Sequence, residues 1–153
     1  MQRFQIERVS LENIELIVPL FDEYRVFYGQ QSDTGAARDF LLERLNLNES
    51  IIFTAVEGDL EDKRAVGFTQ LYPSFSSVSM QRLWILNDLF VTTSSRGCGV
   101  GSLLLDAARE WAVTTGAKGL SLTTMTGNTG AQRLYEASGY VRDCDFYSYN
   151  LYF

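Results

Sequence analysis

The amino-acid sequence predicts a single α/β domain over residues 1–153, with a mixed sheet of six or seven strands and about four helices. Two observations support this prediction. Short apolar or alternating segments, typical of strands, are interspersed with segments whose apolar residues recur at helical spacing. The 153 residues also suffice for one sizeable core, and no repeat, low-complexity tract or linker divides them.

The first half of the chain predicts three strands and two helices. The expected elements are a strand around Phe4, Ile6 and Val9, helices over residues 16–28 and 36–45, and strands over residues 50–56 and 65–72. Ser10 or Asn13 can cap the first helix. Asp33 or Thr34 can cap the second. A charged turn is expected at residues 57–64, and a polar connection containing Phe75 at residues 73–81.

The second half predicts a buried strand over residues 83–91, a glycine loop and then a helix from Gly97 to Trp111. Further along, residues 120–125 alternate as a strand. Residues 128–138 predict a short helix that Gly139 ends. Two more strands are expected, one beginning at residues 140–141 and one over residues 145–153, where aromatic and polar residues alternate.

Composition excludes several classes of function. The net charge of −6 disfavours nucleic acid as a main partner, because phosphate binding requires a basic surface. The lack of histidine excludes Ser-His-Asp and Cys-His catalysis and most zinc sites, so no metal is expected. Cys98 and Cys144 do not make a disulfide framework and predict reduced thiols in the cytoplasm. No membrane span or signal peptide is expected.

The segment Arg96-Gly97-Cys98-Gly99-Val100-Gly101 predicts a phosphate site. A glycine-rich turn at the start of a helix leaves backbone N–H groups unpaired at the positive end of the helix dipole. The segment lacks the lysine of a P-loop, and its glycine spacing does not fit the dinucleotide fingerprint. The pattern that remains is Arg-x-x-Gly-x-Gly.

This loop resembles the coenzyme A pyrophosphate loop of the GNAT N-acetyltransferase superfamily. A second segment, Asn128-x-x-Ala131-x-x-Leu134-Tyr135-x-x-x-Gly139-Tyr140, is similar to that superfamily's motif around its second cofactor-contacting helix. Residues 65–68 and 86–91 look like the spermidine/spermine (diamine) branch and the related yeast-type histone and polyamine acetyltransferases. The resemblance implies the GNAT fold, a mostly antiparallel sheet with a splayed central strand pair, and acetyl-CoA as co-substrate.

The resemblance also implies a cofactor site. Pantetheine would pair with the backbone of strand 86–91 where it splays from strand 120–125, and the loop amides would hold the pyrophosphate. The residues expected to contact the cofactor are Leu89, Phe90, Val91, Arg96, Gly97, Cys98, Gly99, Val100, Gly101, Ser102, Asn128 and Tyr135. We interpret Cys98 as a small loop residue, because acyl-cysteine catalysis needs a neighbouring base.

The implied chemistry is attack of an amine on a thioester. It requires a neutral amine, a polarised carbonyl and a proton for the leaving thiolate. By resemblance the N–H of Val91 polarises the carbonyl and Tyr135 protonates the thiolate, although Tyr135 can equally be an ordinary half-buried aromatic. The diamine branch has a Glu-Asp pair where this chain has Asn87-Asp88. Asn87 cannot take a proton, which leaves Asp88 or ordered water as the base.

Successive strand residues point to opposite faces, so Asp88 is not expected to replace Asn87 directly. Candidates for the acceptor pocket are Tyr24, Tyr28, Tyr72, Phe75, Asn87 and Asp88. The aromatics among them can stack on a cationic amine, but core packing explains them equally well. The aromatic last strand predicts a homodimer, because homologues of this branch pair through C-terminal strands, with sheet packing as the alternative.

The sequence therefore predicts an acetyl-CoA-dependent N-acetyltransferase acting on a small primary amine, such as a polyamine, diamine or amino-acid-like amine. Acetylation of a protein lysine or N-terminus is an alternative that would require an open groove. A non-catalytic acyl-CoA-binding module is another. Asn87 favours that module and Tyr135 argues against it.

Overall fold

The computed structural model describes residues 2–153, which fall into two compact units, one ending at Thr123 and the other comprising Thr124–Phe153. The elements of the first unit are β1 (Phe4–Arg8), a 3-10 turn (Ile14–Leu16), α1 (Val18–Phe27), α2 (Thr34–Asn46), β2 (Ile51–Glu57), β3 (Arg64–Ser76), β4 (Gln81–Val91), a 3-10 turn (Thr93–Ser95), α3 (Val100–Thr114) and β5 (Gly119–Ser121). The second unit contains α4 (Thr129–Ala137). That the chain acts as one domain stays a prediction.

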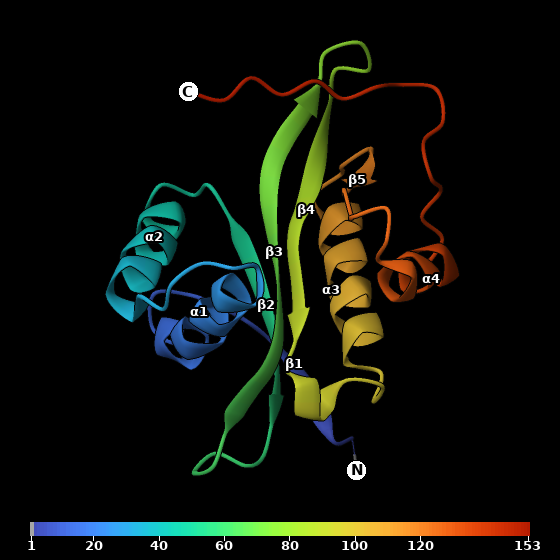
Figure 1. Cartoon of the computed structure of the whole chain (residues 1–153). Coiled ribbons are helices and arrows are strands. Elements are labelled where there is room, and N and C mark those ends of the chain that lie inside the picture. Colours follow the sequence, from blue (N-terminus) through green and yellow to red (C-terminus); the bar gives the residue numbers. More distant parts are fainter. Residues whose placement is uncertain (1) are drawn as a thin grey trace. The chain divides into compact units, whose positions relative to one another are not determined.

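The strands form a mixed sheet in the order β1-β2-β3-β4-β5 (Figure 1). Neighbours from β1 to β4 are antiparallel, and β5 pairs with β4 in parallel. The mixed sheet and the four α-helices of the described residues confirm the predicted fold class. Only a short part of β4 pairs with β5, because β5 has only three residues.

The predicted number of strands is wrong, because the described residues contain five and not six or seven. Residues 140–141 and 145–153 have no regular secondary structure. Alternation predicts which face a strand would bury, but a strand forms only where a neighbour supplies backbone hydrogen bonds. Residues 145–153 have no such neighbour, and Tyr147 and Tyr149 are each 90% exposed. The homodimer stays a prediction without the strand on which it was based.

The first unit has helices on both faces of its sheet (Figure 1). On one face α1 and α2 pack against β3, with Phe21, Leu41 and Phe68 in the core. On the other face α3 packs across β1 to β4, with Val100 and Leu104 against Ala55 and Val66. Each face of the sheet therefore has its own apolar core.

Asp33 rather than Thr34 caps α2, and its carboxylate accepts a hydrogen bond from Ala36 N at 3.0 Å. A second aspartate, Asp22 of α1, binds the loop between α1 and α2. Its buried carboxylate accepts from Ser32 Oγ at 2.6 Å and from Asp33 N at 2.7 Å. The Ser32 hydroxyl, with the Asp33 amide, lowers the pKa of Asp22. Two hydrogen bonds to the Asp22 carboxylate thus link the loop between α1 and α2 to α1.

We expect Asp22→Asn to lower the free energy of unfolding at neutral pH and to leave it less dependent on pH in acid. Because the folded protein lowers the pKa of Asp22, the ionised carboxylate stabilises the fold above its ordinary pKa of about 4. That stabilisation is lost as the pH falls through the lowered pKa. Urea unfolding at pH 7 and at several acid pH values measures the difference. The exposed Asp39→Asn is the control, and an equal gap at every pH would contradict the prediction.

Gly67 of β3 lets α3 approach the sheet. A Cβ at Gly67 would lie 3.0 Å from both Phe90 O and Val100 Cγ1, and 3.2 Å from Leu104 Cδ1. Such contacts are too short for carbon, so the helix or the strand would have to shift. The close packing of β3, β4 and α3 depends on this glycine.

We therefore expect Gly67→Ala to lower the free energy of unfolding by about 1–3 kcal/mol, as overpacking of a close-packed core does. Gly119→Ala is the matched control in β5, because a Cβ there meets no atom within 4 Å. Urea unfolding of both variants measures the effect. Equal stability of the two variants would show that the packing at Gly67 can relax.

A β-bulge in β4 reverses the direction of its side chains. Gln70 pairs with Asp88 and Leu71 with Leu86, so Asn87 is an extra residue without a partner on β3. Before the bulge, Trp84 faces α3 and its ring lies 6.0 Å from Trp111. After it, Phe90 faces α1, 5.7 Å from Tyr24. The predicted strict alternation across Asn87 and Asp88 is therefore wrong, because the bulge interrupts the pleat.

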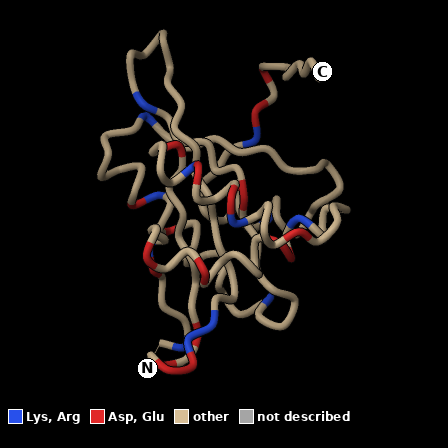
Figure 2. The backbone as a smooth tube through the Cα atoms, turned by 90° about the vertical axis from the view of Figure 1, so that its left-hand side faces the viewer, with Lys and Arg blue, Asp and Glu red and all other residues tan. Residues whose placement is uncertain are grey.

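Charges are distributed widely over the described residues. Figure 2 shows Lys and Arg scattered along the chain with Asp and Glu between them, and no basic stripe follows one described element. Within residues 2–153, no helix is both long and apolar enough to cross a lipid bilayer.

Candidate active site

A buried carboxylate lies at the centre of the first unit. Asp88 is 5% exposed and faces α1 from β4, directly after the bulge. Its Oδ1 accepts a hydrogen bond from Tyr24 Oη at 2.7 Å and another from Asn87 Nδ2 at 3.1 Å. Its Oδ2 accepts from Gln70 Nε2 at 2.7 Å. Three side chains from α1, β3 and β4 thus donate to one carboxylate.

The donors around Asp88 are neutral. Burial and the charge of Asp88 raise the pKa of Tyr24 far above its ordinary value, so this phenol keeps its proton. The same two causes raise the pKa of Tyr72 on β3, and Arg44 opposes the shift. Asn87 and Gln70 carry amides, which do not titrate. The carboxylate is therefore solvated by dipoles instead of a cation.

Within residues 2–153, no lysine or arginine forms an ion pair with Asp88. Buried charges in proteins are normally paired, because desolvation of a lone charge is unfavourable. The hydrogen bond that Thr69 Oγ1 donates at 2.9 Å goes to the backbone carbonyl of Asp88, so it does not neutralise the charge of the carboxylate. Chemically, this carboxylate is suited to bind a cation or to take a proton.

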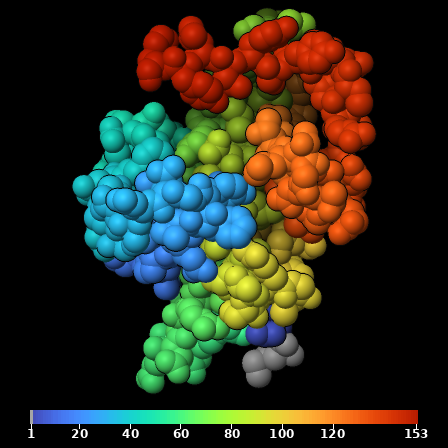
Figure 3. All heavy atoms as spheres, viewed as in Figure 1, coloured from blue at the N-terminus to red at the C-terminus, as the bar shows by residue number. Residues whose placement is uncertain are grey.

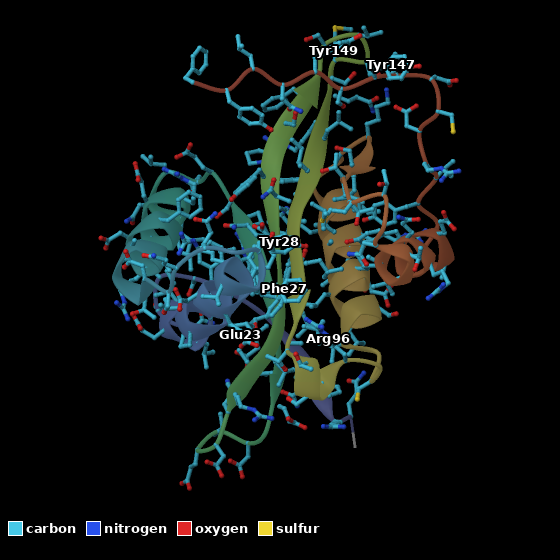
Figure 4. All side chains as sticks on the ribbon, in the orientation of Figure 1. Glu23, Phe27, Tyr28, Arg96, Tyr147 and Tyr149 are labelled. Atoms are coloured by element: carbon cyan, nitrogen blue, oxygen red, sulfur yellow. The ribbon has the colours of Figure 1, made fainter. Side chains whose placement is uncertain are left out.

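Aromatic rings surround the Asp88–Tyr24 pair. Tyr24 contacts Phe68 and Phe90 edge-on, with centroids 5.4 and 5.7 Å away, and Tyr28 at 5.1 Å. Tyr28 is 53% exposed and lies at the end of α1, next to Phe27 (Figure 4). The ring of Tyr24 is therefore a core residue, whereas its hydroxyl points at the carboxylate.

The structure does not bring Phe75 to this cluster. The predicted polar connection is wrong at its start, because β3 continues to Ser76 and includes Phe75, which pairs with Arg82. Phe75 is five residues beyond Gln70, or about 16 Å along the strand. It is 68% exposed, and the guanidinium of Arg82 lies 5.0 Å from its ring centroid. The other predicted acceptor-pocket residues, Tyr24, Tyr28, Tyr72, Asn87 and Asp88, gather around the bulge.

The end of β4 has an unpaired edge on the side of β5. The β4–β5 ladder ends at Ile85 and Ser121, so within the first unit β4 has no neighbour there beyond Ile85. Thr92 N donates to Val66 O at 2.9 Å, which places the hydrogen bonds of even-numbered residues on the β3 side. Leu89 and Val91 therefore direct their backbone groups toward the open edge. Their side chains pack on the α3 side.

The loop after β4 presents free backbone donors. Gly97 and Gly99 have φ of +73° and +84°, a conformation that favours glycine. Gly99 is the N-cap of α3 and offers no side-chain acceptor. Residues 96–99 form a turn that leads into α3, whose first amides have no intrahelical acceptor. These first amides lie at the positive end of a 15-residue helix, which suits a phosphate.

Arg96 and Cys98 support this loop in different ways. Arg96 Nε donates to Val91 O at 3.0 Å and so links the loop to the end of β4. Its guanidinium lies 5.2 Å from the ring centroid of Phe27 (Figure 4). Cys98 is exposed, and its thiol contacts Arg96 O at 3.6 Å. Arg96 thus positions the end of β4. The contact of the Cys98 thiol with Arg96 O is to a backbone carbonyl and not to a base.

An open groove of about 610 Å³ lies beside this end of β4. Its walls come from α1, the β2–β3 hairpin and the 3-10 turn after β4, and Figure 3 shows their surfaces in blue, green and yellow. The lining includes Glu23, Lys63 and Thr93. Asp88 does not line it, so the groove and the buried carboxylate are separate features of the first unit.

The second unit carries the other predicted motif. Asn128 caps α4, because its Oδ1 accepts from Ala131 N at 3.3 Å. The side chain therefore orders the turn at the start of α4. The ring of Tyr135 in α4 lies 6.0 Å from that of Tyr140, and Tyr140 N donates to Tyr135 O at 3.0 Å. Asn128 and Tyr135 belong to a single helical segment that ends at Gly139.

Sequence reasoning missed Gln70 and Thr69. Both are fully buried on β3 and both donate to Asp88, one to its carboxylate and one to its carbonyl. The available signal was their polarity in the middle of the apolar segment Ala65–Tyr72. Two adjacent polar residues there would be unfavourable without buried partners.

Comparisons with known proteins agree on one family. The model of the "Acetyltransferase (GNAT) family" matches residues 17–140. A Bacillus subtilis (strain 168) protein described as "Uncharacterized N-acetyltransferase YhfO" is 47% identical over 146 residues, which cover 95% of each chain. A "Probable acetyltransferase" of Haemophilus influenzae is 37% identical over 99 residues, covering 65% of this chain and 66% of that one.

A solved structure agrees with these matches. The "Crystal structure of a probable acetyltransferase" superposes with a TM-score of 0.90 and is 42% identical, covering 97% of both chains. The similarity thus extends through nearly the whole length of each molecule.

Proposed function

The chain belongs to the acetyltransferase (GNAT) family, and on that premise we propose that it transfers the acetyl group of acetyl-CoA to the primary amine of a small molecule. Enzymes with the GNAT fold are acyltransferases that use acetyl-CoA as co-substrate. The observation that carries the choice of an amine acceptor is Asp88. It is a buried carboxylate with three neutral donors and no ion pair among the described residues. An ammonium group supplies the missing positive charge.

The residues of the first unit fit the co-substrate. The glycine loop at the start of α3 suits the pyrophosphate, and the open edge of β4 suits the amides of pantetheine. When bound, acetyl-CoA supplies a thioester carbonyl as the acyl donor. Val91 N–H then donates to that carbonyl, and Arg96 holds the Val91 carbonyl in place.

Asp88 binds the ammonium form of the acceptor and takes its proton. The proton moves from the amine nitrogen to a carboxylate oxygen, which leaves the nitrogen lone pair free to attack. Because of the bulge, the Asp88 carboxylate faces α1. Asp88 directly precedes Leu89, the first of the two residues whose backbone groups point to the open edge of β4. Tyr24 and Asn87 keep Oδ1 oriented throughout.

Tyr135 would be the proton donor for the sulfur of the thioester when acetyl-CoA is bound, as the resemblance implies. A phenol with an ordinary pKa near 10 is a suitable acid for a thiolate, whose pKa is about 8.5 or higher. Its place in the second motif supports this role. The contact between the rings of Tyr135 in α4 and Tyr140 after it is compatible with a fixed orientation of the Tyr135 ring.

The test is release of free CoA from acetyl-CoA in the presence of a panel of acceptors. Diamines, polyamines, amino acids, aminoglycosides and basic peptides are supplied separately, and the product is identified by mass. Turnover on a small amine supports the proposal. Turnover on peptides alone would support a protein acetyltransferase, and tight CoA binding without turnover on any amine would support a binding module.

A further inference from the structure

Gln70 occupies an unusual position for an amide side chain. It is fully buried in the middle of β3, opposite Asp88 across the bulge. Its Nε2 donates to Asp88 Oδ2 at 2.7 Å, a short, charge-assisted hydrogen bond. Gln70 is the donor to Oδ2, whereas Tyr24 and Asn87 both donate to Oδ1.

The rest of the Gln70 amide has no structural explanation. Its Oε1 is buried and accepts no hydrogen bond from the described residues. A buried acceptor without a hydrogen bond destabilises a fold, because it has lost its contact with water. Leucine would fill the same space without that penalty, so packing alone does not account for glutamine here. The amide is explained if its other end, Nε2, is needed by the carboxylate.

We infer that Gln70 is a positioning residue that keeps Asp88 ionised and aligned until the acceptor amine arrives. The inference rests on the proposed function and adds a residue that the family resemblance did not indicate. Gln70 Nε2 holds Oδ2 at 2.7 Å, and a hydrogen bond donated to a carboxylate oxygen favours the charged form in general. The carboxylate can then bind an ammonium and accept that group's proton. The unpartnered Oε1 is the alternative partner of Oδ2 once Oδ2 carries a proton, because an amide can turn about its last bond.

Several titratable groups face Asp88 from the packed elements. Tyr24 comes from α1 and Tyr72 from β3, while Tyr28, directly after α1, acts on Tyr24 and Arg44 of α2 acts on Tyr72. Burial and the charge of Asp88 raise the pKa values of Tyr24 and Tyr72, so both phenols keep their protons at neutral pH.

The experiment compares Gln70→Leu with the wild type over a range of pH. Removing the donor makes the carboxylate take a proton more readily, so the acidic limb of kcat/KM should move up by about one pH unit. Activity should return toward the wild-type value at alkaline pH. Gln70→Glu, with the same shape, places a second carboxylate beside the first, so the limb should move further, by about two units. Calorimetry of amine binding in the absence of acetyl-CoA should rank the variants in the same order. The pH below which binding weakens should rise from the wild type to Gln70→Leu and further to Gln70→Glu.

Thr69→Val is the matched control. Thr69 is equally buried on the same strand, and it donates to the backbone carbonyl of Asp88 instead of its carboxylate. The substitution keeps the shape of the side chain and should lower stability without moving the acidic limb. CoA affinity, measured for every variant, reports whether the cofactor half is folded.

The outcomes separate the two proposals. If the wild type acetylates an amine and both Gln70 variants keep its acidic limb, the inference about Gln70 is wrong and the proposed function stands. A shift of equal size in Thr69→Val would also overturn it, because loss of stability would then be the cause. If the wild type acetylates no amine, the proposed function fails and the inference fails with it.

Discussion

Asp88→Asn is expected to lower kcat/KM for the acceptor amine by about 10²- to 10⁴-fold, the range seen when a general base is removed. The variant can neither pair with an ammonium nor take its proton. Loss of the ion pair should raise KM, and loss of the proton acceptor should lower kcat, so both losses reduce kcat/KM. Steady-state kinetics with the best acceptor of the panel, from pH 6 to pH 10, measure it.

The variant should fold. The new amide oxygen can still accept from Tyr24 and Asn87, and Gln70 can turn its amide so that Oε1 accepts from the new N–H. Asn87→Ala is the comparison, because it removes one donor at 3.1 Å and keeps the carboxylate. Its effect should be much smaller. If Asp88→Asn keeps the wild-type rate and pH profile, water and not Asp88 carries the proton away.

Tyr135→Phe should lower kcat by about 10²-fold while leaving the affinity for CoA nearly unchanged. The phenylalanine ring keeps the apolar surface of α4 but has no proton for the departing thiolate. The loss should be smaller with a thioester whose thiol is more acidic, since that leaving group needs less help. Pre-steady-state measurement of CoA release separates this chemical step from product release.

Tyr140→Phe is the control for this variant. Its ring lies 6.0 Å from that of Tyr135, in the same unit and next to the same helix end. We expect it to retain most of kcat. If Tyr135→Phe retained full kcat at all pH values, the general-acid role would be refuted and Tyr135 would be a packing residue only.

The cofactor half of the molecule could be predicted from local sequence. Gly97 and Gly99 require positive φ, and a helix that starts without a side-chain cap leaves its amides free. Both properties depend on residues close together in the chain. The cap of α2 by Asp33 and the cap of α4 by Asn128 were predictable for the same reason.

The acceptor half depends on contacts between distant parts of the chain. Alternation predicted that Asn87 and Asp88 point to opposite faces, and the bulge between β3 and β4 overrides it. The donors that reach Asp88 come from residues 18 and 64 positions away, so no local pattern identifies them. The missing last strands have a similar cause, because pairing with a neighbour and not alternation decides whether a strand forms.

By itself the sequence determined the family, the mixed α/β class, the glycine loop and the second motif, because each is encoded by spacing along the chain. Only the tertiary structure decided the surroundings of Asp88. There, the register of one bulge places Gln70, Tyr24 and Asn87 on a single buried carboxylate. Register is a property of two strands together, and the charge of a buried group depends on everything packed around it.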